Sequence, residues 1–247
     1  MRARVRVGCC GWNRIGLVVP KEDREGASLL ESYARIFDSV EINSSFYQYH
    51  REATYRAWRQ TVGPKFSFTI KAHKDITHVH RLAVNKQVLD CIERMSEACR
   101  AIGAEVLLLQ TPASLCHSQE SIAAAKDLLE NLKIPKVRVA WETRGQSWST
   151  PQARSDLAKL LCEQGATHAV DIFKERPAHV EGFFYFRLHG LGKRMYDYKY
   201  SEDDLRRLME LSRPYLKDGG YIFFNNYEMY DDARRFLGML RPSGAGP

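Results

Sequence analysis

Charged and polar residues follow short apolar segments at several points along this chain, and they are of the types that proteins use in catalysis. In the segment from Val137 to Trp148, an apolar, β-branched run is followed at once by Glu142 and Arg144. A buried strand that ends in charge is typical of parallel α/β proteins, where ligands bind at the carboxyl ends of the strands. The other apolar segments end in the same way, at Glu41 and Asn43, Lys71, Gln110, Asp171, Arg187 and His189, and Asn225 and Asn226.

Five of these residues are the candidate catalytic groups, namely Glu41, Lys71, Glu142, Asp171 and His189. Three carboxylates and a histidine provide enough ligands for one or two divalent metal ions in a hydrolase or isomerase. A metal-free site, in which the carboxylates act as general acid and base, is an equally good interpretation. Lys71 is also a candidate base or Schiff-base amine. The cofactor therefore stays open, with a divalent metal ion as one alternative.

Arginines and aromatic residues near the strand ends suggest how a substrate is held. Arg144 and Arg187 suit bidentate recognition of a phosphate or carboxylate, and the alternative is a structural network of ion pairs across the site. Trp12, Tyr47 and Trp148 are expected to form an aromatic wall around it. The remaining candidates for substrate contacts are Asn43, His78, Gln110, Asn225 and Asn226.

The segment 192–200 alternates basic residues with tyrosines and follows the seventh apolar segment. Phosphate sites of α/β barrels often lie after strands seven and eight, and interleaved tyrosines suit stacking on a base or sugar. The candidates here are Lys193, Arg194, Tyr196 and Tyr200. The alternative is a loop that packs over its own barrel.

Composition limits the class of protein and its partners. The chain has 247 residues and a net charge of +7, which favours an anionic partner such as a phosphate ester, DNA or RNA, although it is equally compatible with a general solubility charge. No apolar run approaches the roughly 20 residues of a membrane span. The N-terminus lacks the apolar core of a secretion signal, and the spacing of the six cysteines matches no zinc pattern. We therefore expect a cytoplasmic protein with reduced thiols and no membrane contact; the oligomeric state stays unknown.

Hydrophobic periodicity predicts eight strands that alternate with about seven helices. The strands are expected at 5–10, 39–42, 66–70, 104–109, 137–141, 167–170, 183–188 and 221–224. The segment 172–182 is too short, and too interrupted by Pro177, for a regular helix between strands six and seven. Right-handed crossovers then predict a TIM (β/α)8-type barrel, formed by one domain over residues 1–247 with a flexible tail at 241–247.

Several motifs resemble the YecE-like family, a family of unknown function with a TIM-barrel fold. They are Gly11-Trp12, the string from Val40 to Tyr47, Lys71-Ala72 followed by Ile76-Thr77-His78, Glu142-Thr143-Arg144 with Ser147-Trp148, the string from Tyr185 to Gly190, and Phe224-Asn225-Asn226. The sequence departs from the family pattern at Cys9-Cys10, between Gly16 and Pro20, and at Gln110-Thr111-Pro112. The resemblance implies a barrel similar to those of apurinic-site endonucleases and sugar isomerases.

These observations predict an enzyme with a polar, charged pocket at the C-terminal rim of the barrel. Its expected substrate contains phosphate or sugar, and the sharper version is hydrolysis of a phosphodiester in nucleic acid. The alternatives are a non-catalytic nucleic-acid-binding protein and a sugar-phosphate isomerase or lyase.

Overall fold

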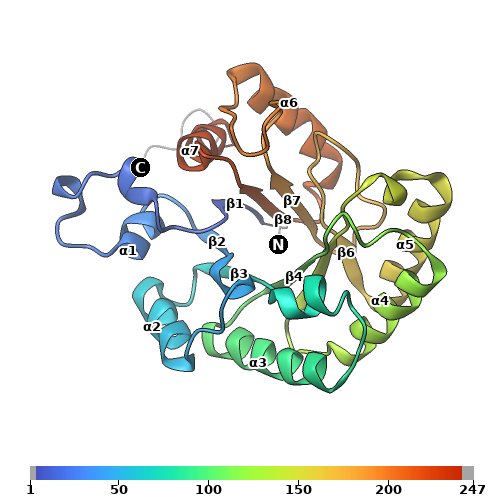
Figure 1. The fold of residues 1–247 in the computed structure, drawn as a ribbon. Coiled ribbons are helices and arrows are strands. Elements are labelled where there is room, and N and C mark those ends of the chain that lie inside the picture. Colours follow the sequence, from blue (N-terminus) through green and yellow to red (C-terminus); the bar gives the residue numbers. More distant parts are fainter. Residues whose placement is uncertain (1–3, 241–247) are drawn as a thin grey trace.

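Eight parallel strands form a nearly closed barrel in the computed structural model of the chain, which describes residues 4–240 (Figure 1). The strands are β1 (Val5–Cys9), β2 (Ser39–Ile42), β3 (Ser67–Lys71), β4 (Val106–Gln110), β5 (Arg138–Glu142), β6 (Ala166–His168), β7 (Phe184–Leu188) and β8 (Gly220–Phe224). Their order is β6-β5-β4-β3-β2-β1-β8-β7. A single bridge between Val170 and Phe186 joins the two ends of this sheet.

Helices surround the strands on the outside of the barrel (Figure 1). They are α1 (Leu29–Ala34), α2 (Glu52–Val62), α3 (Lys86–Ile102), α4 (Gln119–Asn131), α5 (Pro151–Gln164), α6 (Glu202–Ser212) and α7 (Met229–Leu240). Short helical turns lie at Ile15–Leu17, Glu22–Arg24, Ser44–Phe46, Asp75–Val79, Gln146–Ser149 and Arg213–Tyr215. Between β6 and β7 the chain has no helix, as the sequence predicts.

Local sequence signals explain where several helices begin and end. Ser201 caps α6 through a reciprocal capping box with Asp204, which satisfies backbone groups that the first turn leaves free. Gly103 and Gly165 follow α3 and α5 in the left-handed conformation, which glycine adopts without steric cost. These end points let each helix return the chain to the start of the next strand.

The buried residues form two separate apolar groups because the side chains of a strand alternate in direction. The larger group fills the layer between the strands and the helices and includes Ile70, Leu107 and Phe186. The smaller group lies inside the barrel and includes Leu108, Tyr185 and Phe223. An apolar interior of this kind is a packed core and not a channel, so polar side chains of the inward series are left to gather at the ends of the barrel.

The structure confirms the predicted barrel and moves several boundaries by one or a few residues. Lys71 and Gln110, expected just after their strands, are the last residues of β3 and β4. The sixth strand is shorter than expected and ends at His168, because Val170 pairs only through the isolated bridge. The expected flexible tail at 241–247 lies outside the described residues. Within residues 4–240, no helix combines the length and apolar character needed to cross a membrane.

Candidate active site at the barrel mouth

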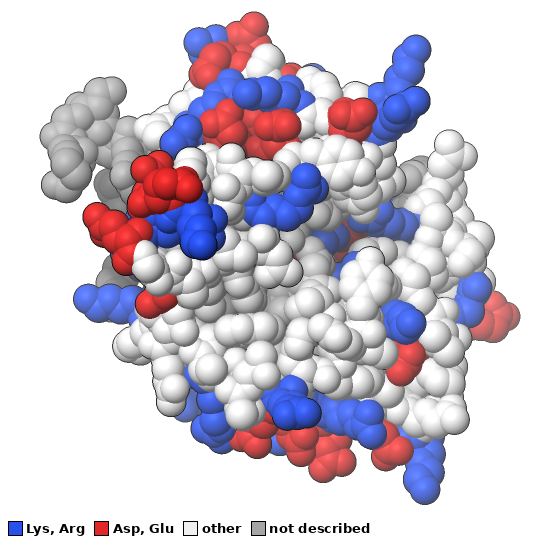
Figure 2. All heavy atoms as spheres, turned by 60° about the vertical axis from the view of Figure 1, so that its left-hand side comes forward, with Lys and Arg blue, Asp and Glu red and all other residues white. Residues whose placement is uncertain are grey.

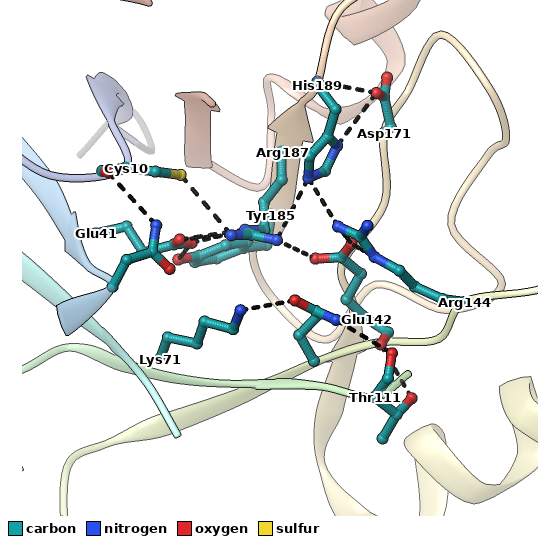
Figure 3. A network of polar contacts seen from close by, with 12 residues as sticks. Cys10, Glu41, Lys71, Thr111, Glu142, Arg144, Asp171, Tyr185, Arg187 and His189 are labelled. Carbon is teal, nitrogen blue, oxygen red and sulfur yellow. Dashed lines mark hydrogen bonds and ion pairs between the residues drawn. The ribbon is translucent and has the colours of Figure 1, made fainter. Parts of the chain in front are cut away.

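Arg187 is the centre of a buried polar network at the carboxyl ends of the strands (Figure 3). Its guanidinium group donates to both oxygens of Glu41, from Nε to Oε2 at 2.9 Å and from Nη2 to Oε1 at 2.8 Å. Nη1 donates to Glu142 Oε2 on the opposite side. Arg187 is 1% exposed and Glu41 is fully buried. The two carboxylates therefore compensate a cation that is almost completely shielded from water.

A second arginine connects this network to the histidine. Arg144 Nε donates to Glu142 Oε1 at 2.7 Å, and its Nη2 lies 2.9 Å from His189 Nε2. Because a guanidinium can only donate, Nε2 of His189 must be the acceptor. The proton of the neutral ring is then on Nδ1, which lies 3.4 Å from Asp171 Oδ2. Asp171 also accepts the His189 backbone N–H at 3.1 Å, so it holds both the ring and its strand end.

The charges in this network fix the protonation of its members. Burial by itself raises the pKa of Glu41 and of Glu142, but the arginines outweigh it and leave the pKa of both carboxyls below its ordinary value. Burial lowers the pKa of His189, and the hydrogen bond to Asp171 only partly opposes this shift. Two carboxylates and a neutral imidazole are therefore the stable forms at neutral pH.

Lys71 has a different environment from the two arginines. Its Nζ donates to the amide oxygen of Gln110 at 2.7 Å and lies 3.9 Å from the centre of the Phe46 ring. It forms no ion pair with any residue between positions 4 and 240. Burial, followed by repulsion from Arg187, lowers the pKa of Lys71 to about 8. Lys71 is thus a buried amine that is partly neutral near physiological pH.

The carboxylates do not form the metal site that the sequence left open. In the described part of the chain, no group of three or more His, Cys, Asp and Glu side chains is placed to hold a metal ion. The oxygens of Glu41 and Glu142 instead accept hydrogen bonds from Arg187 and Arg144. The arginines occupy the positions that a metal ion would need, so the geometry fits the ion-pair network and not a metal centre.

A cavity of about 310 Å³ opens above Arg187 and Lys71 at the carboxyl ends of the strands. Figure 2 shows a hollow with Lys and Arg atoms inside it and mainly uncharged residues around it. Its lining contains three cations and no carboxylate. The lining residues are Arg14, Asn43, Tyr47, Lys71, Gln110, Arg187, Tyr196, Asn225, Asn226, Tyr227 and Met229. Glu41 lies beneath Arg187 and does not reach this surface.

Amide side chains and tyrosines make up most of the rest of the cavity wall. Asn226 donates to the Tyr198 carbonyl and to Asp232, while its Oδ1 is buried without a partner among the described residues. Tyr47 and Tyr227 are 71% and 57% exposed at the edge of the cavity. The wall therefore offers hydrogen-bonding groups within and aromatic rings at its rim.

A second cavity of about 310 Å³ lies beside the first, on the side of Asp171 and His189. Glu142 and Arg144 also line it. Adjacent residues of the loop after β7 separate the two spaces, because Tyr196 lines the first cavity and Met195 lines the second. The candidate catalytic groups are therefore divided, with Lys71 in one space and His189 and Asp171 in the other.

Several expected contact residues are placed elsewhere. Trp12 is buried against Trp58, and Trp148 is buried with its indole N–H donating to the Leu115 carbonyl, so only Tyr47 remains of the expected aromatic wall. His78 packs on Phe46 next to Lys71 but does not line the cavity. His73, which follows β3, is buried against Tyr49.

The basic loop after β7 contributes less to the cavity than its sequence suggests. Lys193 and Arg194 are exposed and lie outside both linings. Tyr200 is fully buried, and its hydroxyl accepts the Gly190 N–H at 2.8 Å. Of the expected residues, only Tyr196 reaches the first cavity, because Tyr200 is turned inward and Lys193 and Arg194 are exposed to solvent.

Sequence reasoning missed four residues of the site. Tyr185 donates to Glu41 Oε2 at 2.7 Å, and its position two residues before Arg187 on the same strand is a signal that could have found it. Arg14 and Tyr227 line the cavity from loops, and Met229 lines it from the first position of α7. None of the three lies on a strand, so strand periodicity offers no comparable signal for them. The sulfur of Cys10, which directly follows β1, lies 3.9 Å from Arg187 Nη2.

Comparisons with known proteins agree with this architecture. The structure is similar to a DUF72 family protein from Thermotoga maritima, with a TM-score of 0.74, 25% identity, and coverage of 96% of this chain and 99% of that chain. A DUF72 family protein from Enterococcus faecalis gives a TM-score of 0.76 at 18% identity, covering 96% and 98% of the two chains. A D-psicose 3-epimerase gives a TM-score of 0.62 at 11% identity over 95% and 98%, which shows a shared fold alone.

Comparison at the level of sequence gives one match. No curated protein matches the chain significantly, but a family model does. The family described as "Protein of unknown function DUF72" matches residues 6–246, which is nearly the whole length. Because this match spans all eight strands and the network at their ends, the chain belongs to the DUF72 family, which is the family of the YecE-like proteins.

Proposed function

We propose that this protein is an enzyme that binds a phosphorylated, sugar-like substrate in the cavity beside Lys71. The observation that carries the proposal is the charge of the lining, which includes Arg14, Lys71 and Arg187 and no carboxylate. Arg14 and Lys71 form no ion pair with any described residue. Arg187 is neutralised from below by Glu41 and Glu142, so Arg14 and Lys71 supply the unpaired positive charge. An anionic group is the natural partner of such a surface.

The neutral part of the wall supports a substrate that carries hydroxyl groups. Asn43, Gln110, Asn225 and Asn226 line the cavity with amides, which can both donate and accept hydrogen bonds. The buried Oδ1 of Asn226 lacks a donor, and a substrate hydroxyl group would supply one. Several structural neighbours act on sugars according to their names, among them the D-psicose 3-epimerase. They share the fold, which is compatible with this substrate class but does not assign it.

Lys71 is the group that we propose for the chemistry. Glu41 and Glu142 are held as carboxylates by the arginines, and Nε2 of His189 is occupied by Arg144. These groups are therefore poor proton acceptors, whereas Lys71 has a pKa of about 8, lowered chiefly by burial. A group that titrates near the working pH is effective in proton transfer and as a nucleophile.

Calorimetry would test the binding part of the proposal. We expect ribose 5-phosphate to bind more tightly than ribose. We also expect Arg14→Gln to lower the affinity for ribose 5-phosphate by roughly tenfold, which corresponds to one lost charged contact of about 1.4 kcal/mol. Lys217→Gln is the matched control, because Lys217 is exposed in the loop before β8, at the opposite end of the barrel. Equal affinity for the two sugars, or equal effects of the two substitutions, would contradict the proposal.

A phosphodiester of nucleic acid is the second candidate substrate. It is favoured by Tyr47 and Tyr227, whose exposed rings stand beside a cationic cavity and suit stacking on unpaired bases. This alternative predicts that short single-stranded oligonucleotides bind more tightly than ribose 5-phosphate and lose affinity steeply with salt. The double substitution Tyr47→Ala with Tyr227→Ala would then lower the affinity for the oligonucleotide and leave the affinity for the sugar phosphate nearly unchanged.

A further inference from the structure

Lys71 is the single primary amine among the residues that line the first cavity, since the other two cations are guanidinium groups. Guanidinium groups stay protonated in proteins and are not nucleophiles, whereas an ammonium group can lose its proton and attack carbon. Lys71 is the last residue of β3, so the barrel itself positions the start of its side chain. Ser45 strengthens this position, because its hydroxyl donates to the Lys71 carbonyl at 2.7 Å.

The contacts of the amine hold it in place without requiring it to be charged. Gln110 Oε1 accepts from Nζ, and the Gln110 amide is oriented by a second bond from its Nε2 to the Thr111 carbonyl. An amide oxygen accepts from a neutral amine as well as from an ammonium group, although the charged donor makes the stronger bond and is also favoured by the face of the Phe46 ring at 3.9 Å. The nearest carboxylates, Glu41 and Glu142, are engaged by arginines instead. This arrangement differs from an ordinary buried lysine, which pairs with an acid.

The neighbouring cations favour the neutral amine. Burial is the largest cause and the charge of Arg187 adds to it; Glu41 and Glu142 act in the opposite direction, and the net effect is a pKa of about 8 for Lys71. At pH 7.5 the neutral share of such an amine exceeds that of an ordinary lysine by on the order of a hundredfold. The group is therefore available as a nucleophile where surface lysines are not.

We infer that Lys71 forms a covalent imine with the carbonyl carbon of a phosphorylated aldehyde or ketone bound in this cavity. The inference rests on the proposed function and specifies its substrate class. In this step the Lys71 nitrogen forms a bond to the carbonyl carbon, the carbon–oxygen double bond is lost, and the oxygen leaves as water. A protonated lysine and a neutral carbonyl give a protonated imine and one water molecule, so atoms and charge balance without a further reactant.

The position of the cations also limits where the anionic end of the substrate lies. Arg14 enters the cavity from the loop after β1, where its guanidinium group lies 5.8 Å from the centre of the Tyr227 ring. Lys71 lies on β3, under the same opening. A substrate that holds its phosphate against Arg14 and points its carbonyl group toward the strands would reach the amine, whereas the second cavity has no lysine apart from the half-exposed Lys174.

Reductive trapping followed by mass spectrometry tests the inference. The protein is incubated at pH 8 with sodium cyanoborohydride and, in turn, glyceraldehyde 3-phosphate, dihydroxyacetone phosphate and ribose 5-phosphate. The hydride from the borohydride converts the imine into a stable secondary amine. We expect a single adduct on Lys71 with at least one of these compounds, and its rate of formation should rise as the pH passes through about 8.

Two substitutions distinguish the role of the primary amine of Lys71 from the role of its positive charge. Lys71→Arg keeps the cation, so it should retain phosphate binding within a few-fold and form no adduct. Lys71→Met removes both, and we expect it to fold at least as stably as the original protein, because it no longer buries a charge against Arg187. Lys217→Met controls for surface labelling and should leave the Lys71 adduct unchanged.

The outcomes distinguish this inference from the proposed function. If calorimetry detects binding but the modified lysines are the same in the original protein and in Lys71→Met, the covalent step is wrong and the binding site stands. If none of the three compounds binds, the proposed function fails, and this inference fails with it. Selective modification of Lys71 that disappears in Lys71→Arg would support both.

Discussion

Arg187 is a fully buried cation whose stability depends on the carboxylates on either side of it. Glu41 binds two of its nitrogens, and Glu142 binds the third and also pairs with Arg144. Removing one partner of a buried pair leaves an uncompensated charge, which costs more than the pair contributes relative to apolar residues. These carboxylates are therefore better understood as supports for the arginines than as acid–base groups.

We predict that Glu142→Gln lowers the free energy of unfolding by about 3 kcal/mol at pH 7, as expected for the loss of one partner of a buried ion pair. Asp203→Asn removes an exposed ion pair with Arg206 and should change the free energy of unfolding by less than about 0.5 kcal/mol. Urea denaturation of the two variants checks this difference. Losses of equal size would mean that the buried network is not a major source of stability.

The same variant should show a specific dependence on pH. The pKa of Glu142 is lowered in the folded state, although burial opposes the shift. Its stabilising contribution is then complete above the unfolded pKa of about 4.3 and decreases as the pH falls further. The difference between the original protein and Glu142→Gln should therefore narrow below about pH 4, and a constant difference down to pH 3 would argue against this assignment.

At the scale of elements, the loop after β7 decides the shape of the site. Gly190 begins this loop with a φ of 91°, and a Cβ atom at this position would lie 2.6 Å from Tyr198 Cβ. The loop then places Met195 in one cavity and Tyr196 in the other. A residue without a side chain is needed where the chain turns this closely against itself.

Gly190→Ala should accordingly lower the free energy of unfolding by about 2 kcal/mol and weaken the binding of ribose 5-phosphate, because the loop must move away from Tyr198. The matched control is Gly238→Ala in α7, where, among residues 4–240 and apart from its own helix backbone, no atom lies within 4 Å of the added Cβ. That change should stabilise the protein by about 0.5 kcal/mol, since alanine favours a helix. Thermal denaturation should thus shift in opposite directions for the two variants, and shifts of the same sign would refute the steric account.

At the scale of the whole molecule, the barrel is weakly joined where the sheet closes. The ends at β6 and β7 meet through the single bridge from Val170 to Phe186, and among the remaining neighbours of the described sheet only β1 and β2 are in register through one pair, Cys9 and Val40. The segment between these strands also has no helix to cover it. The second cavity opens at this junction, through Val170, Asp171 and His189.

Hydrogen exchange should reveal this junction. We predict that the amide of Val170, which donates to the Tyr185 carbonyl, exchanges faster than those of Leu107 and Leu109 within β4. Fewer neighbouring hydrogen bonds have to break before it opens, so its local opening free energy is lower. Amide exchange followed by nuclear magnetic resonance measures both groups in one sample. Equal protection at the two places would show that the barrel is closed as firmly there as elsewhere.

The sequence alone was sufficient for the fold and for the end of the barrel at which the candidate residues lie. Apolar segments that end in charge predicted the strands, and Pro177 correctly indicated a missing helix. Because parallel strands of a barrel all point the same way, Glu41, Lys71, Glu142, Asp171 and His189 had to end near one rim, and all five are found there.

Tertiary structure decided what these residues do to one another. Residue types could not show that Arg187 would bind both glutamates, that Lys71 would have an amide for a partner, or that Tyr200 would turn inward while Tyr196 faces the cavity. Strand direction is a local property that a short segment of sequence encodes through its periodicity. The pairing of charges at the end of a barrel depends on distances of a few ångströms between strands that are far apart in the chain, and only the folded molecule sets those distances.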